Sequence, residues 1–158
     1  MSNRLVLAIF GAGSLMLGAY TQRPPRWTAS IKMVHEDRVN ESVDSVRGIG
    51  TSFGSASWTQ GETPTISVVD LTFTYGGNER ELAWGVFVGR CRSATVPIAP
   101  ISSFPEIEFT GGGPARVQAQ LPIELPKTGQ YHLNVYRDRS AEESSIIACG
   151  DLKYSAKG

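Results

Sequence analysis

Two histidines are the side chains of this chain best suited to metal binding or proton transfer, and they lie far apart in the sequence. His35 is followed by Glu36 and Asp37 in a polar stretch, which is typical of a solvated loop histidine. His132 follows Tyr131 in a predicted strand, where it would be a surface histidine or an interface contact. A metal centre needs several donors from positions that meet in the fold. The sequence therefore predicts no metal ligand and no cofactor.

Other patterns that could support catalysis have simpler explanations. The acidic pairs Glu106/Glu108 and Glu142/Glu143 could do acid–base work, but each falls in a predicted loop or on a solvated strand face. The glycines of residues 111–113 lack the lysine and the helix that follow a phosphate-binding loop, so they predict a turn between strands. No nucleophile stands beside a base in a recognisable motif. We expect no catalytic residue and no enzymatic activity.

The chain has two cysteines, Cys91 and Cys149. An even count after a membrane-targeting segment favours a disulfide formed in an oxidising compartment. Closing a loop of this length should stabilise the fold by roughly 4 kcal/mol in the chain-entropy treatment. A redox role is not expected, because the chain has no C-x-x-C motif and no histidine near either cysteine.

Residues 5–20 are uncharged and mostly apolar, which predicts a helix that engages a membrane. Such a helix would be roughly 24 Å long at 1.5 Å per residue, so Arg4 and Arg23 must snorkel for it to cross. Pro24 and Pro25 would end it. The side chains expected to hold the segment in the membrane and at its interface are Leu5, Phe10, Leu15, Leu17, Tyr20 and Trp27.

A cleavable signal peptide and a permanent anchor are both compatible with this segment. Cleavage needs small residues at the −3 and −1 positions, but the best site, Leu17-Gly18-Ala19, has leucine at −3. Tyr20 stands where a lipid-modified cysteine would follow, so the lipoprotein route is closed. We therefore expect residues 1–27 to form an anchor or an uncleaved signal-like helix.

Length and charge limit the remaining possibilities. A chain of 158 residues suits one domain with a short appendage. Fifteen basic and fifteen acidic residues cancel, so no electrostatic field would attract nucleic acid. Residues 28–47 are polar and fit either a short helix or an extended arm that binds a partner. Residues 48–158 are expected to form a β domain.

Six segments of that domain have the composition of strands, and turn residues separate them. They are residues 50–59, 64–75, 82–88, 115–123, 130–136 and 145–152; residues 31–35 could add another strand. Within residues 64–75 the apolar alternation changes phase at Val69-Asp70, which predicts a β-bulge. The number and spacing of the strands favour an all-β fold, an antiparallel Greek-key sandwich preceded by the hydrophobic helix. The apolar, proline-rich residues 95–105 would pack on this sandwich or be exposed for a partner.

Three features together resemble the Cu/Zn superoxide dismutase-like sandwich. They are the strand and loop Trp84-Gly85-Val86-Phe87-Val88-Gly89-Arg90-Cys91, the strand of residues 131–136, and the terminal Ala148-Cys149-Gly150. The likeness covers about residues 48–154. In that family a loop cysteine is bridged to the cysteine of a C-terminal Ala-Cys-Gly motif, which implies the same pairing of Cys91 with Cys149 here.

The resemblance also locates the copper ligands, and this chain departs from the family at each of them. A His-Val-His strand supplies two ligands in the family and a late strand supplies another. The matching positions here are Gly85, Phe87 and Tyr136. Copper sites need imidazole nitrogens, which glycine and phenylalanine cannot replace. We interpret these three residues as vestigial metal positions.

These observations predict a non-catalytic subunit that is membrane-anchored, with its sandwich in the periplasm. Its partners would be integral membrane protein subunits of a larger complex that it stabilises. Bacterial photosynthetic reaction-centre and light-harvesting complexes have extrinsic polypeptides of this build, although a respiratory or transport complex fits the same residues. The alternatives are a divergent dismutase-like metalloenzyme and a secreted ligand-binding module.

Overall fold

The computed structural model describes residues 24–34, 50–91, 96–111 and 113–156. They form an all-β structure with two short 3-10 turns, η2 (Ile101–Ser103) and η3 (Glu143–Ser145). The strands are β1 Arg26–Met33, β2 Gly50–Gln60, β3 Ser67–Gly76, β4 Glu81–Val88, β5 Val96–Pro97, β6 Ile107–Glu108, β7 Ala115–Leu121, β8 Tyr131–Tyr136 and β9 Ile146–Ser155. The expected all-β class and the six expected strand segments are confirmed.

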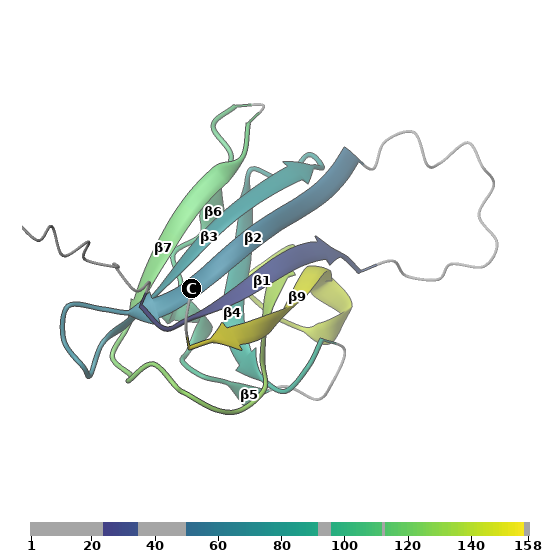
Figure 1. The fold of residues 1–158 in the computed structure, drawn as a ribbon. Coiled ribbons are helices and arrows are strands. Elements are labelled where there is room, and N and C mark those ends of the chain that lie inside the picture. Colours follow the sequence, from purple (N-terminus) through teal and green to yellow (C-terminus); the bar gives the residue numbers. More distant parts are fainter. Residues whose placement is uncertain (1–23, 35–49, 92–95, 112, 157–158) are drawn as a thin grey trace, which may run out of the picture.

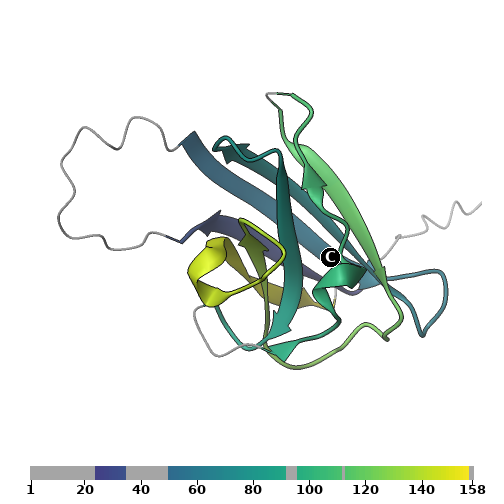
Figure 2. The same cartoon turned by 180° about the vertical axis from the view of Figure 1, so that it is seen from behind.

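The strands form an antiparallel sheet that curls around its main core (Figure 1). Along the sheet the order is β5-β4-β8-β9-β1-β2-β3-β7, and β6 pairs with the start of β4. Both η2 and β6 contact β4 and β7. As Figure 2 shows, these short elements therefore bridge the two long strands at which the curled sheet would otherwise be open.

Strand β1 belongs to the centre of the sheet, where it pairs with β2 on one side and β9 on the other. Trp27, Ala29 and Ile31 are buried in the core, and the residues between them are exposed. The indole Nε1 of Trp27 donates a hydrogen bond to the carbonyl of Pro126 at 2.7 Å. Trp27 is thus a core residue of the β domain.

Two expectations for this region are therefore wrong. Trp27 is not an interfacial residue of the anchor, and residues 28–33 are not part of an arm that precedes a domain starting at residue 48. The error has a physical reason. A tryptophan just after an apolar segment suits a membrane interface and a strand start equally well, and only the pairing of β1 with β2 and β9 distinguishes them.

Strand β3 has no bulge at the position expected. Ser67, Val69, Leu71 and Phe73 are buried on one face, and the pairing with β2 continues unbroken from Thr74 back to Ser67. The phase change in the sequence arises because Ser67 takes a core position where an apolar residue was expected. The irregularity in this strand pair lies between Gly50 and Phe53 of β2 instead.

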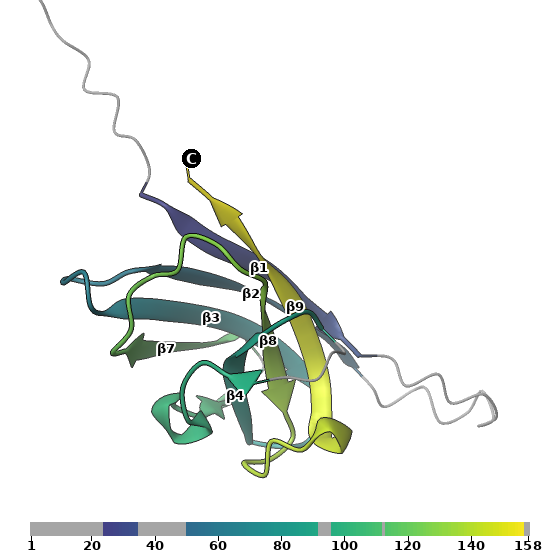
Figure 3. The ribbon, with the colours of Figure 1, turned by 90° about the horizontal axis from the view of Figure 1, so that it is seen from below.

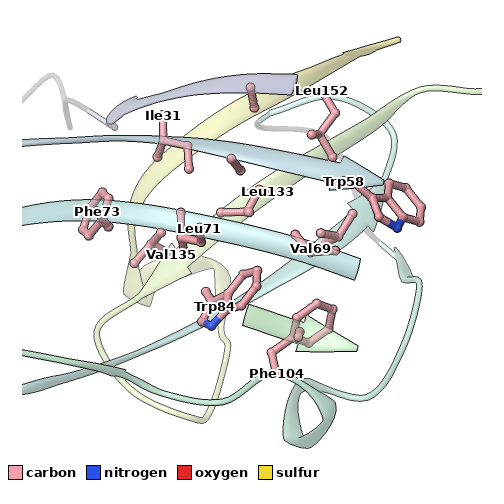
Figure 4. Close-up of a cluster of buried hydrophobic side chains, with 14 of the residues drawn as sticks. Ile31, Trp58, Val69, Leu71, Phe73, Trp84, Phe104, Leu133, Val135 and Leu152 are labelled. Atoms are coloured by element: carbon pink, nitrogen blue, oxygen red, sulfur yellow. The ribbon is translucent and has the colours of Figure 1, made fainter. Parts of the chain in front are cut away.

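The main core contains large aromatic side chains from opposite sides of the curled sheet (Figure 4). Trp58 and Trp84 have no exposed surface. Trp84 packs edge-on against Phe104, with ring centroids 5.0 Å apart, and its Nε1 donates to the carbonyl of Pro105. Phe104 follows η2, so this contact holds the loop after β5 against the core. Ile98 also packs there, whereas Val96 is exposed, so the proline-rich loop is packed in part and exposed in part.

The anchor residues Leu5, Phe10, Leu15, Leu17 and Tyr20 lie outside the described residues, as do residues 35–47 of the expected arm. Within the part of the chain that the structure describes, no helix is long and apolar enough to cross a membrane.

The sheet has two ends, which Figure 3 shows from below. We call one the Arg26 end, because β1 begins there opposite Thr59 of β2 and Ser155 of β9. Strand β8 begins at the same end, where Tyr131 pairs with Leu152 of β9 and with Val88 of β4. The opposite end, with Met33 of β1, is the Met33 end.

Candidate functional site

Strands β4 and β8 are buried on both faces. Leu82, Trp84 and Val86 point into the main core, and the alternate residues form a second cluster on the other face. Strand β8 has the same division, with Leu133 and Val135 in the main core. A buried second face explains why both strands have long runs of buried residues, and it creates a site outside the main core.

Gly85, Phe87 and Tyr136, the positions interpreted from the sequence as vestigial metal positions, lie together at this second cluster. Gly85 pairs with Asn134, and two residues further along the same two strands Phe87 pairs with His132. The rings of Phe87 and Tyr136 pack edge-on, with centroids 5.8 Å apart. Only 4% of Phe87 and 1% of Tyr136 is exposed. The three positions that the resemblance matches to copper ligands are thus neighbours. They belong to a closed cluster that contains the rings of Phe87 and Tyr136.

Side chains from η2, from the connection between β8 and β9, and from the start of β9 cover the cluster. Ile101 of η2, Ala141 and Ile146 pack against it. A Cβ atom added at Gly85 would lie 2.9 Å from Cδ1 of Ile101 and 3.3 Å from Cε2 of Phe87. The absence of a side chain at Gly85 therefore lets Ile101 close over the sheet. The space beside Gly85 is thus occupied by the hydrocarbon of Ile101 and Phe87.

His132 lies in the same cluster and has no exposed surface. Its ring stacks on Phe87, with centroids 5.6 Å apart and planes 24° apart. Neither ring nitrogen has a hydrogen-bond partner among the described residues. Burial lowers the pKa of His132, and the Gly89 carbonyl and the Asp151 carboxylate oppose this effect in part. The prediction that His132 is a surface or interface residue is wrong, because the side chains that cover the cluster also bury the outer face of β8.

Asn134 and Tyr136 make the polar contact of the cluster. The Nδ2 of Asn134 donates to the hydroxyl of Tyr136 at 3.0 Å, and Oδ1 of Asn134 has no partner among the described residues. Burial raises the pKa of Tyr136, so its hydroxyl stays neutral. A neutral phenol beside a neutral, buried imidazole supplies two possible donors, which is too few for a typical copper site.

The disulfide expected between Cys91 and Cys149 is present, with Cα atoms 5.9 Å apart. Cys149 pairs with Asn134 of β8, so the bridge lies beside the cluster. The backbone N–H of Cys91 also donates to Oδ1 of Asp151 at 2.8 Å. These two links hold the chain after β4 against β9.

The other candidate residues do not join the cluster. Glu106 forms an ion pair with Arg139, and Glu108 pairs across the strands with Glu81. Glu142 and Glu143 are exposed at η3. Gly111 and Gly113 lie in the connection between β6 and β7, which agrees with a turn, although Gly112 is outside the described residues. Among the described residues, no group of three or more His, Cys, Asp or Glu side chains could hold a metal ion.

A hollow of about 690 Å³, which no sequence pattern predicted, lies at the Met33 end and is lined by residues 75, 77–81 and 108–111. The hydroxyl of Tyr75 donates to Glu79, which also pairs with Arg137 at 3.3 Å. Burial raises the pKa of Tyr75 to about 12, so it is a neutral hydrogen-bond donor. The hollow forms because the two-residue strand β6 pairs with the start of β4, and so short a strand has no recognisable sequence pattern.

Comparison with family models, with curated proteins and with solved structures finds no match to this chain.

Proposed function

We propose that this chain is a non-catalytic accessory subunit that stabilises a larger membrane protein complex. In this proposal residues 5–20 anchor it in the membrane, and the β domain lies in the periplasm or another extracytoplasmic space. Its partners are integral membrane protein subunits, as in a bacterial photosynthetic reaction-centre and light-harvesting complex or another membrane assembly of similar build.

The observation that carries the non-catalytic part is the packing at Gly85, Phe87 and Tyr136. These residues lie together and are almost fully buried beneath Ile101, which supports a site without catalysis. Glycine and phenylalanine offer no lone pair to an ion. Since function depends on a site and not on a fold, loss of this site favours a role in surface contact.

We propose further that the curled sheet is a Greek-key sandwich of the dismutase-like type. The strand order supports this topology, because β4 lies beside β8 and β7 beside β3, so that long connections cross between the two halves. The bridge from Cys91 to Cys149 supports it as well. A disulfide also favours an oxidising compartment, which agrees with a location outside the cytoplasm.

The test is extraction of the full chain from its native membranes. We expect it to stay with the membranes through an alkaline wash, and to co-purify with integral membrane subunits in mild detergent. The alkaline wash should release a Leu7→Arg/Leu15→Arg variant from the membranes, because charges in the apolar segment oppose insertion. Leu7→Ile/Leu15→Ile is the matched control and should be retained. A soluble monomer that has lost its first residues would contradict the proposal.

The same preparation separates the two alternatives. Stoichiometric copper or zinc in the purified protein would favour a divergent dismutase-like metalloenzyme. An intact mass that lacks about the first nineteen residues would favour a secreted ligand-binding module.

A further inference from the structure

The Arg26 end of the sheet is the end that the apolar segment can bring to a membrane. Five residues separate Tyr20 from Arg26, so even a fully extended chain spans at most about 20 Å between them. Pro24 and Pro25 are exposed immediately before β1, and their fixed φ angles limit how far this connection can bend. The Met33 end is a further seven residues along β1, about 23 Å away.

The same end has an exposed apolar rim. Val88 is 48% exposed and Val96 is 67% exposed, and the two pair directly across β4 and β5. Pro97 beside them is also exposed. Among the described residues the remaining exposed large apolar side chain is Phe53, which is 56% exposed and pairs with Lys32 toward the Met33 end.

Strand pairing connects this rim to the first half of β1: Val88 pairs with Tyr131, Tyr131 with Leu152, and the neighbouring Lys153 pairs with Thr28. Four steps across the sheet, from β1 through β9, β8 and β4 to β5, correspond to about 19 Å at the usual strand spacing. In Figure 1 the start of β1 lies at the left and strand β5 at the bottom, and both are away from the connection between β6 and β7 at the top. The tether and the apolar rim are therefore on one end of the molecule.

Charge does not favour an electrostatic contact there. The charged residues described toward the Arg26 end nearly balance, four basic against three acidic: Arg26, Arg90, Lys127 and Lys153 against Glu62, Glu124 and Asp151. A surface that binds anionic lipid by charge would carry an excess of basic side chains. The rim of Val88, Val96 and Pro97 is instead suited to shallow apolar contact with the interfacial zone of a bilayer.

We propose that the Arg26 end of the domain lies against the lipid surface, with Val88 and Val96 in contact with the headgroup region. This inference rests on the proposed membrane anchor. The contact sets the orientation of the subunit, so the Met33 end and its hollow face away from the membrane and toward the extrinsic parts of a complex.

The test uses the full chain in nanodiscs of phosphatidylcholine and maps exposed side chains by carbene footprinting with mass spectrometry. Val88, Val96 and Phe53 are similarly exposed in the domain itself, so Phe53 is the internal control. We expect labelling at Val88 and Val96 to be about threefold lower than at Phe53, because side chains pressed into an interface lose most of their exposed area. Inserting a long glycine–serine linker between Arg23 and Pro24 should reduce this difference.

Equal labelling of all three side chains in nanodiscs that hold the protein would overturn the inference while leaving the anchor intact. Protection of Val88 and Val96 in native membranes but not in the lipid-only discs would also overturn it, and would assign the rim to a protein partner. Failure of the chain to elute with the nanodiscs is a different result: it removes the proposed anchor, and the orientation with it.

Discussion

The imidazole of His132 stacks on the ring of Phe87, with centroids 5.6 Å apart, where the two strands β4 and β8 pair. Phe87 stands at a position where the resemblance implies a copper-binding histidine, and the imidazole present belongs to His132 on the neighbouring strand. There it packs as a flat, neutral ring inside an apolar cluster. The side chains of this cluster therefore act by packing against one another.

Replacing Phe87 with alanine should destabilise the domain by about 3–5 kcal/mol, because it leaves a cavity between His132, Tyr136 and Ile101. Chemical unfolding measures the change. Val88→Ala is the control in the same strand, and its half-exposed side chain should cost no more than about 1 kcal/mol. Similar losses for the two variants would show that the outer cluster is not a second core.

His132 should make stability fall as the solution becomes acidic. Burial lowers its pKa in the folded protein below the ordinary value of about 6.5. Between these two pKa values the unfolded chain binds a proton and the folded protein does not, so stability is full above about pH 6.5 and is lost as the pH falls from there toward the folded pKa. A His132→Leu variant should lose this dependence.

Unfolding free energies measured from about pH 7.5 to 5.5 test this point, since histidine is the side chain that ordinarily titrates in that interval. The difference between the wild type and His132→Leu isolates the contribution of His132 from that of groups far from it. His35→Gln is the control and should retain the acid sensitivity. Parallel pH profiles for the wild type and His132→Leu would contradict a buried neutral imidazole.

Removing the disulfide with Cys91→Ser/Cys149→Ser should lower the free energy of unfolding by about 4 kcal/mol. The bridge closes a loop of 58 residues between β4 and β9. Its removal therefore mainly increases the conformational entropy of the unfolded chain. Reducing the wild type should give the same loss, and reductant should leave the double variant unchanged. A loss below about 1 kcal/mol would mean that native contacts such as Cys91 with Asp151 suffice.

Histidines introduced at Gly85, Phe87 and Tyr136 should create a metal site. Gly85→His/Phe87→His/Tyr136→His places three imidazoles on neighbouring positions of β4 and β8, which is a donor set that binds copper or zinc. Titration calorimetry and electron paramagnetic resonance measure binding. Since a side chain at residue 85 would crowd Ile101, a second version adds Ile101→Ala to make room.

The control for this graft carries Gly85→His with Phe87→Leu and Tyr136→Phe, which leaves one new imidazole. A folded triple variant that binds no more copper than this control would show that the three positions do not share a pocket, and would count against the family resemblance.

Trp27→Ala should destabilise the domain by about 3–5 kcal/mol and leave membrane retention unchanged, because the indole packs against Trp58, Tyr131 and Tyr154. Trp27→Phe should cost less, about 1–3 kcal/mol, through loss of the hydrogen bond to Pro126 and part of the packing. Unfolding and alkaline membrane washing measure the two properties. If the Trp27→Ala variant kept normal stability but no longer stayed with the membranes, Trp27 would be assigned to the anchor.

Local sequence pattern was sufficient to predict much of the fold of this protein. Alternating residues in β7, the turn glycines and the cysteine pair predicted strands, turns and a disulfide that the structure contains. These features depend on near neighbours or on a chemical pairing with a single partner. The same local pattern placed a bulge in β3 that is absent, because Ser67 occupies a core position despite its polarity.

The sequence by itself determined the all-β class, most strand positions and the types of side chain at the candidate metal positions. Only the tertiary structure decided that Trp27 is a core residue, that His132 is buried and that the two-residue strand β6 completes the hollow. These properties depend on strands and loops distant in sequence, whose pairing and covering contacts decide which face of each strand water reaches.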